Sequence, residues 1–200
     1  MAKRYRKHGL DKSARQIVEF LQRRGLAGAT VLEVGGGVGE IQLELLKRGA
    51  GRTVNLELSA GYEQEAARLV REAGVEGRVE RRIHDVAVDP AAVEPVDIVV
   101  LHRVVCCYPD LDALLGAAAD RAQRQLVLTY PPHNALSRRV ISLLNLVQRL
   151  RRHEFRVFVW PRREIARVAE DHGLTPVREG RASPLWRWAA FERQPQVRLP

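Results

Sequence analysis

Four glycines stand between two apolar segments near the start of this 200-residue chain. The run at 31–34 is typical of a buried strand, and the apolar spacing at 41–46 indicates an amphipathic helix. Between them, Gly35, Gly37 and Gly39 leave the backbone amides of a turn and a helix start without neighbouring Cβ atoms. Because a nucleotide-like ligand can approach such amides closely, the sequence predicts a cofactor site at this turn.

The spacing of the glycines is not that of a dinucleotide site. A dinucleotide-binding turn needs glycine or alanine at position 40, and this chain has Glu40 there. A carboxylate at a helix start repels a pyrophosphate group. A ligand without phosphates therefore fits this turn better.

Acidic residues end the next two predicted strands. Glu57 lies in the strand expected at 53–58, where a carboxylate can accept hydrogen bonds from both hydroxyls of a ribose. Asp85 closes the strand expected at 78–84, a place suited to binding an adenine amino group, with Val86 beside the ring. Because open parallel sheets bind ligands at the carboxyl ends of their strands, we expect these groups to meet there.

Strands and helices alternate along the chain, which predicts an α/β fold with a parallel sheet covered on both faces. Further strands are expected at 96–101 and 126–130. Two late strands, around 176–179 and 186–193, are expected to form an antiparallel pair.

The two ends of this alternation carry additional segments. Residues 1–28 are expected to form an N-terminal tail and a helix capped by Asp11. Residues 132–160 contain a long helix at 135–151 with arginines around it, which indicates a lid or acceptor-side insertion. Since no linker divides the chain, we expect a single domain over 1–200.

In this order the motifs resemble those of class I S-adenosylmethionine-dependent methyltransferases. The resemblance rests on the turn within 31–39, on Glu57, on Asp85 and on the strands at 97–102 and 126–131. It covers residues from about 10 to 193. It implies a Rossmann-like, mostly parallel seven-stranded sheet with an antiparallel C-terminal strand, and S-adenosylmethionine as the cofactor of a methyltransferase.

The resemblance also implies which residues bind the cofactor. It places the glycine turn at the methionine end, Glu57 at the ribose, and Asp85 with Val86 at the adenine. The cofactor-binding residues that it assigns are Glu33, Gly35, Gly37, Gly39, Glu57, Leu58, Asp85, Val86 and His102.

The acceptor site is marked by fewer residues. Methyl transfer requires an in-line approach of the acceptor, and a base is needed only for a protonated acceptor. His102 is the first candidate base, because imidazole titrates near neutral pH and this family usually places acceptor contacts in the loop after the 96–101 strand. An alternative is that His102 only hydrogen-bonds the backbone or the cofactor carboxylate. His133, after the 126–130 strand, is the second candidate base.

Aromatic and thiol side chains also lie near the same strand ends. Tyr108 and Tyr130, together with His133, are candidates for binding the substrate, although isolated tyrosines are more often core residues. Cys106 and Cys107 are adjacent, match no metal-binding spacing and are expected to be buried and inert. No metal site is predicted.

Arginine dominates the charge of the chain. The 33 basic residues outnumber the 24 acidic residues, for a formal net charge of +9. We find no signal peptide and no apolar run of the roughly 18 residues that a membrane span needs, so a cytoplasmic location is expected.

The preferred hypothesis is methyl transfer to an oxygen or nitrogen of a small molecule. The alternative is an RNA-directed methyltransferase or a polyanion-binding protein that uses a face formed by the arginine-rich tail and the segment 138–156. A nucleic-acid partner is not favoured, because the chain shows no appended RNA-binding domain. A protein that binds the cofactor without turnover is a third hypothesis.

Overall fold

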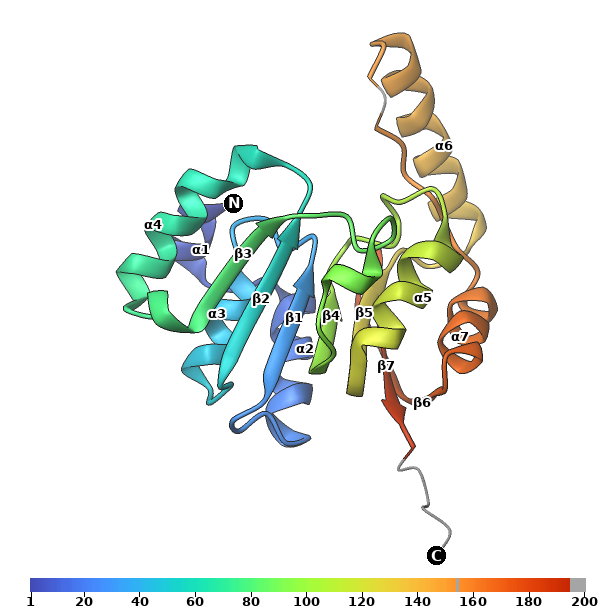
Figure 1. Ribbon diagram of the computed structural model, residues 1–200. Coiled ribbons are helices and arrows are strands. Elements are labelled where there is room, and N and C mark those ends of the chain that lie inside the picture. The colour runs from blue at the N-terminus through green and yellow to red at the C-terminus, as the bar shows by residue number, and fades with distance from the viewer. Residues whose placement is uncertain (154, 195–200) are drawn as a thin grey trace, which may run out of the picture.

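The computed structural model describes residues 1–153 and 155–194, which form one seven-stranded sheet with flanking helices (Figure 1). The strand order is β3 (Val79–Ile83), β2 (Arg52–Glu57), β1 (Thr30–Val34), β4 (Val96–Leu101), β5 (Ala122–Tyr130), β7 (Trp186–Arg193) and β6 (Leu174–Ser183). Neighbours from β3 to β5 are parallel, and β7 runs antiparallel to β5 and β6. The predicted fold class is confirmed.

Helices cover both faces of the sheet. One face carries α1 (Ala2–His8), α2 (Lys12–Arg23), α3 (Glu40–Lys47) and α4 (Glu63–Ala73), and the other carries α5 (Leu111–Arg121) and α7 (Arg162–Asp171). Short 3-10 turns lie at Ala60–Tyr62, Glu76–Arg78 and Pro90–Ala92. α2 begins at the predicted cap, because the Asp11 carboxylate accepts a hydrogen bond from the Ala14 amide at 3.0 Å.

The central strand β4 contributes to both hydrophobic cores. Ile98 and Val100 pack with the α2 and α3 side, whereas Val99 and Leu101 pack with the α5 and α7 side. All four side chains are fully buried. A strand covered on both faces is apolar throughout, which is why the sequence marks it so clearly.

The strand order reverses beside β1. From β1 the chain moves outward to β2 and β3, and it then returns to place β4 on the other side of β1. The connections after β1 and β4 therefore lead to opposite sides, which opens a crevice at the carboxyl edge of the sheet.

The N-terminus is a helix where the sequence analysis expected a tail. Arg6 of α1 binds Glu72 of α4 at 2.8 Å, and the Tyr5 hydroxyl donates to Glu44 of α3 at 2.7 Å. These contacts hold α1 across the body and bring Met1 to the crevice. The short, strongly basic sequence of α1 has no helix-start signal of its own, so tertiary contacts stabilise it.

The helix α6 (Ala135–Leu150) agrees closely with the helix expected at 135–151. Figure 1 shows α6 standing away from the sheet, beyond the edge at which the parallel strands end. Asn145 ties it to the returning chain, because its side chain donates to the Val157 carbonyl at 2.8 Å and accepts from the Val157 amide at 2.9 Å. None of the helices in the described part of the chain has the length and apolarity to cross a membrane.

Candidate functional site

A cavity of about 540 Å³ opens at the carboxyl ends of the parallel strands. The predicted site residues that line it are Gly35, Gly37, Glu57, Leu58, Asp85, Val86, His102 and Tyr108. They lie at or just after the carboxyl ends of β1, β2, β3 and β4, so the crevice gathers groups that lie far apart in the sequence.

The Glu57 carboxylate is fixed at the end of β2 by three backbone amides. One oxygen accepts from the Gly37 amide at 2.8 Å, and the other accepts from the amides of Leu58 and Ser59 at 2.9 and 3.0 Å. An ionised carboxylate has about four lone-pair positions, so it retains acceptor capacity towards the cavity. Glu57 therefore both holds the glycine turn and offers an acceptor for ligand hydroxyls.

The turn after β1 faces the cavity on one side and packs against buried side chains on the other. Gly36 leaves no room for a side chain, because a Cβ atom there would collide with Asn55 and lie 2.8 Å from the Glu33 carboxylate. Gly37 has a φ of 54°, in the left-handed region that favours glycine. Position 36 therefore needs glycine for space and position 37 needs it for backbone conformation.

Glu33 lies beneath this turn and does not line the cavity. It is 2% exposed and accepts hydrogen bonds from the Gln42 amide at 3.3 Å and from the Asn55 side chain at 3.4 Å. Burial, reinforced by the charge of Glu40, raises the pKa of Glu33 to about 8. The structure thus places Glu33 as a support for the turn.

Asp85 and Tyr108 join the loops after β3 and β4. The Tyr108 hydroxyl donates to Asp85 at 3.1 Å, and the Ala87 amide donates to the other carboxylate oxygen at 3.0 Å. Burial and the Asp85 charge raise the pKa of Tyr108 above its usual value. Tyr108, which was predicted to bind substrate, lies at the end of the cavity predicted to bind adenine.

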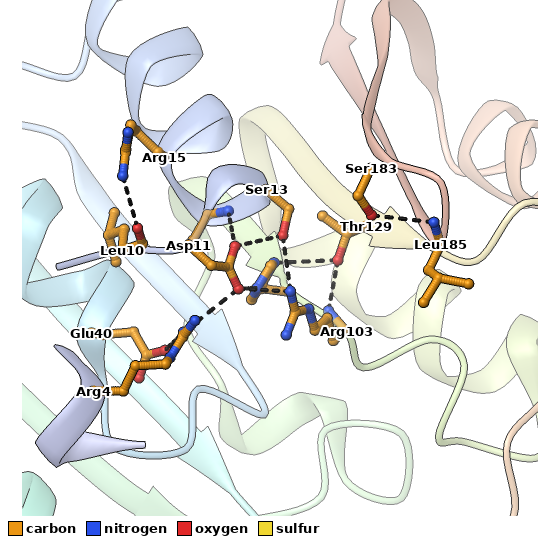
Figure 2. Close-up of polar contacts among 12 residues, drawn as sticks. Arg4, Leu10, Asp11, Ser13, Arg15, Glu40, Arg103, Thr129, Ser183 and Leu185 are labelled. Atoms are coloured by element: carbon orange, nitrogen blue, oxygen red, sulfur yellow. Dashed lines mark hydrogen bonds and ion pairs between the residues drawn. The ribbon is translucent and has the colours of Figure 1, made fainter. Parts of the chain in front are cut away.

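The opposite end of the cavity contains a network centred on Asp11 (Figure 2). The Asp11 carboxylate lies 2.7 Å from the Arg103 guanidinium and 3.7 Å from both Arg4 and the His102 Nε2 atom. Burial opposes its ionisation, but the His102 imidazole and hydrogen bonds from Ala14 and Ser13 hold the pKa of the Asp11 carboxyl well below its usual range. Asp11 therefore acts as a helix cap and as an anion in the site.

Both ring nitrogens of His102 face protein groups. Nδ1 lies 3.3 Å from the Thr129 hydroxyl, and Nε2 faces Asp11. The Arg103 amide donates to the same Thr129 hydroxyl at 2.8 Å. These contacts fix the imidazole at the edge of the cavity, with about a tenth of its side chain exposed.

Arg103 has a conformation that is unusual for a residue with a side chain. Its φ is 61°, in the left-handed region, and its guanidinium lies 4.8 Å from the centre of the Trp186 ring. Such a backbone costs on the order of 1 kcal/mol and persists where surrounding contacts hold it. Asp11, Thr129 and Trp186 supply those contacts.

Glu40 completes the charged end of the cavity. It is 7% exposed, lies 3.7 Å from Arg4, and has one carboxylate oxygen without a hydrogen-bond partner among the described residues. Burial raises its pKa, and the charge of Arg4 partly offsets that effect. The Arg103 Nε atom is likewise buried without a partner in the described structure. A carboxyl group and a guanidinium group, each with an unfilled hydrogen-bonding position, thus adjoin one end of the site.

The remaining predicted residues lie outside this cavity. Gly39 has a φ of 82° and precedes α3. Tyr130 is 2% exposed within the core under α5 and α7, where burial raises its pKa. His133 is exposed and lines a separate hollow of about 1050 Å³ beside α6. The structure therefore does not bring His133 and His102 together.

The two cysteines differ in environment, contrary to the expectation that both are buried. Cys106 is buried, whereas Cys107 is exposed and lines the cavity. Their sulfur atoms lie 3.6 Å apart, and this contact together with burial raises the pKa of Cys106.

Sequence reasoning missed several residues that line the cavity. Asp11 was recognised as a helix cap, Glu40 only as a group that repels phosphate, and Arg103 and Phe155 were not singled out. Arg103 carries no sequence signal, because its role depends on a positive φ and on contacts with α2.

A model of a methyltransferase domain family matches residues 4–179. The chain belongs to this methyltransferase family. The prediction of a class I S-adenosylmethionine-dependent methyltransferase is thereby confirmed, and the enzyme assignment with it. The sequence had no significant match among curated proteins.

Solved structures with the same fold include other methyltransferases. The magnesium protoporphyrin IX methyltransferase from Synechocystis, with bound S-adenosylhomocysteine, has a TM-score of 0.75 and 22% identity, over 92% of this chain and 82% of that chain. An O-methyltransferase family protein from Burkholderia thailandensis has a TM-score of 0.71 and 21% identity, over 92% and 57%. A geranyl diphosphate methyltransferase in complex with geranyl diphosphate and sinefungin has a TM-score of 0.72 and 17% identity, over 90% and 79%. At these identities the likeness concerns the fold.

Proposed function

We propose that this methyltransferase transfers a methyl group from S-adenosylmethionine to an oxygen or nitrogen of a small-molecule acceptor. The observation that carries the proposal is that one cavity is lined by the Asp85–Tyr108 pair, by Glu57 and by the Asp11–Arg103 network. These three groups suit the adenine, the ribose and the amino acid part of the cofactor, in that order. Similar folds belong to proteins named for small acceptors, among them a mitomycin 7-O-methyltransferase.

The residues present fit this cofactor at each end. Glu57 and Leu58 would hold the ribose, and Asp85 with Val86 would hold the adenine. The methionyl group carries an ammonium and a carboxylate, and the unfilled hydrogen-bonding atoms of Glu40 and Arg103 complement that pair of charges. When bound, S-adenosylmethionine supplies an electrophilic methyl group.

His102 is proposed as the base that accepts a proton from the acceptor. The imidazole lines the cavity at the end where Glu40 and Arg103 lie. Its Nε2 atom lies 3.7 Å from Asp11, beyond hydrogen-bond distance, so the proposal assigns the proton to this nitrogen. Thr129 fixes the orientation of the ring through Nδ1. His133 lines a different hollow, so the proposal assigns it to the acceptor side and not to this proton transfer.

Binding and turnover distinguish these roles. S-Adenosylhomocysteine affinity is measured by calorimetry, and turnover is measured as S-adenosylhomocysteine formed against fractions of a metabolite extract. We expect His102→Ala to leave that affinity within about twofold and to lower turnover by about a hundredfold. His8→Ala, on the exposed face of α1, is the control. Equal turnover in His102→Ala and the unaltered enzyme would remove the base assignment, and no binding of S-adenosylhomocysteine would remove the proposal as a whole.

A further inference from the structure

One side of α6 is an exposed apolar stripe. It consists of Val140, Leu143, Leu144, Val147 and Leu150, which follow one another at helical spacing. Leu143 is 63% exposed and Leu150 is 76% exposed. Large apolar side chains grouped in this way mark an interaction surface, whereas a single exposed leucine does not.

The contact that ties α6 to the body lies on a different side of the helix. Asn145 forms both hydrogen bonds with Val157, and Asn145 lies two positions from Leu143 and Val147, which turns it well away from the stripe. Figure 1 shows α6 projecting away from the sheet, and the five residues of the stripe are between 36% and 76% exposed. The stripe is therefore available to a partner outside this domain.

Arginines are the charged residues of α6, which contains no aspartate or glutamate. Arg138, Arg139 and Arg149 lie on α6, and Arg151 and Arg152 follow it directly. By helical spacing, Arg138 and Arg149 lie on the same side as Asn145, so they form the polar face of the helix behind the apolar stripe. The sequence from 135 to 153 contains no aspartate or glutamate. The partner of this surface must therefore satisfy apolar and cationic groups at the same time.

These two requirements discriminate among the partners. A second copy of the chain would bury the leucines but would leave the arginines of α6 without counter-charges, and it would join two chains that each carry a formal net charge of +9. An RNA would pair with the arginines but would leave the leucines in water. An anionic lipid surface satisfies both, because acyl chains cover the apolar side while headgroups bind the arginines.

We propose that α6 binds the surface of an anionic lipid bilayer and lies along the interface. Its 16 residues correspond to about 24 Å, which is shorter than a bilayer core, and its arginines oppose insertion across the membrane. Phe155, 49% exposed, follows α6 and lines the cofactor cavity. Docking through α6 therefore holds the cavity close to the bilayer.

Vesicle co-sedimentation tests the proposal on the full chain. The probe is vesicles of equal parts phosphatidylcholine and phosphatidylglycerol, compared with phosphatidylcholine alone. We expect binding to the anionic vesicles that weakens as salt is raised. The double variant Leu143→Gln/Leu150→Gln should weaken it about tenfold or more, because both side chains lose their burial in the acyl region. Arg138→Gln/Arg149→Gln should weaken it by a similar factor, at about 1 kcal/mol for each arginine near the surface.

The controls are an exposed aliphatic residue and two exposed arginines outside α6. Val88 is 77% exposed, and the side chains of Arg163 and Arg23 are 85% and 75% exposed. Val88→Gln and Arg163→Gln/Arg23→Gln should bind vesicles almost as the unaltered protein does. All variants should keep the circular dichroism spectrum and the S-adenosylhomocysteine affinity of the unaltered protein. A changed spectrum would reveal a folding defect, and a lack of S-adenosylhomocysteine binding in the unaltered protein would reveal a wrong cofactor assignment.

Three results would overturn the proposal. The first is the absence of binding to anionic vesicles at low salt. The second is a dimer in sedimentation velocity that Leu143→Gln/Leu150→Gln abolishes, which would assign the stripe to a second copy. The third is a pair of results: Leu143→Gln/Leu150→Gln keeps its binding to vesicles, and Arg138→Gln/Arg149→Gln loses its binding both to vesicles and to single-stranded RNA. That outcome would assign the surface to polyanions in general.

Discussion

The carboxylate of Glu57 accepts a hydrogen bond from the backbone amide of Gly37 at 2.8 Å, which links the end of β2 to the turn after β1. The two residues are 20 positions apart, and the contact is buried. A single side chain thus sets the position of the glycine amides and presents its own acceptor atoms to the same cavity. Cofactor affinity and the conformation of the turn are expected to be coupled through Glu57.

Substitution of Glu57 tests this coupling. Glu57→Ala removes the acceptor proposed for the ribose hydroxyls and the hydrogen bond that holds the Gly37 amide. S-Adenosylhomocysteine affinity should therefore fall by at least about tenfold in calorimetry. Glu57→Gln keeps one side-chain oxygen that can accept from the backbone amides. Its affinity for S-adenosylhomocysteine should therefore lie between that of Glu57→Ala and that of the unaltered protein. Glu76→Ala, an exposed acid in the turn before β3, is the control. Unchanged affinity in Glu57→Ala would contradict the assignment.

Gly36→Ala tests the space under the turn. The added Cβ collides with Asn55 and crowds Glu33, so the free energy of unfolding in urea should fall by about 2 kcal/mol or more. Gly77→Ala is the matched control, because a Cβ there meets no atom within 4 Å. If the two variants were equally stable, the turn would not be packed as described.

The raised pKa of Glu33 predicts a pH dependence of stability. The folded chain holds this proton up to a pKa of about 8, whereas the unfolded chain releases it near the ordinary value of 4.5. The folded state therefore binds more protons in that window, so the free energy of unfolding falls as pH rises, by up to about 1.4 kcal/mol per pH unit. Above the folded pKa this contribution levels off.

Glu33→Gln should remove that slope. Urea unfolding between about pH 5 and pH 8 is expected to show the variant gaining stability relative to the unaltered protein as pH rises. The amide oxygen can still accept from the Gln42 amide, so the comparison isolates the proton. Parallel stability profiles for the two proteins would show that Glu33 is already ionised at neutral pH.

Cys107 provides a chemical probe of the cavity. Its thiol is exposed in the cavity lining, while Cys106 is buried with a raised pKa. Iodoacetamide should therefore modify Cys107 first, and S-adenosylhomocysteine should slow that reaction several-fold by covering the cavity. Mass spectrometry of the labelled peptide identifies the site, and Cys107→Ser should lose the rapid phase. Labelling that S-adenosylhomocysteine leaves unchanged would place the ligand elsewhere.

Elements with a strong local pattern were predicted closely. Strand β4 begins and ends as expected, and β7 covers the expected range, because their apolar runs are bounded by polar residues. Strand β5 begins four residues earlier than expected, at Ala122. The buried Gln125 resembles a loop residue in the sequence, but its side chain is paired with the Arg24 carbonyl and with Glu192.

The sequence by itself determined which strand ends carry Glu57, Asp85 and the glycine turn, because strand periodicity and glycine spacing are local properties. Only the tertiary structure decided that Asp11 and Ser13 meet Arg103, about 90 positions away, and that Phe155 rather than His133 reaches the cavity at the strand ends. Those contacts depend on how helices dock on the sheet, and docking sums many weak packing terms that no short segment of sequence contains.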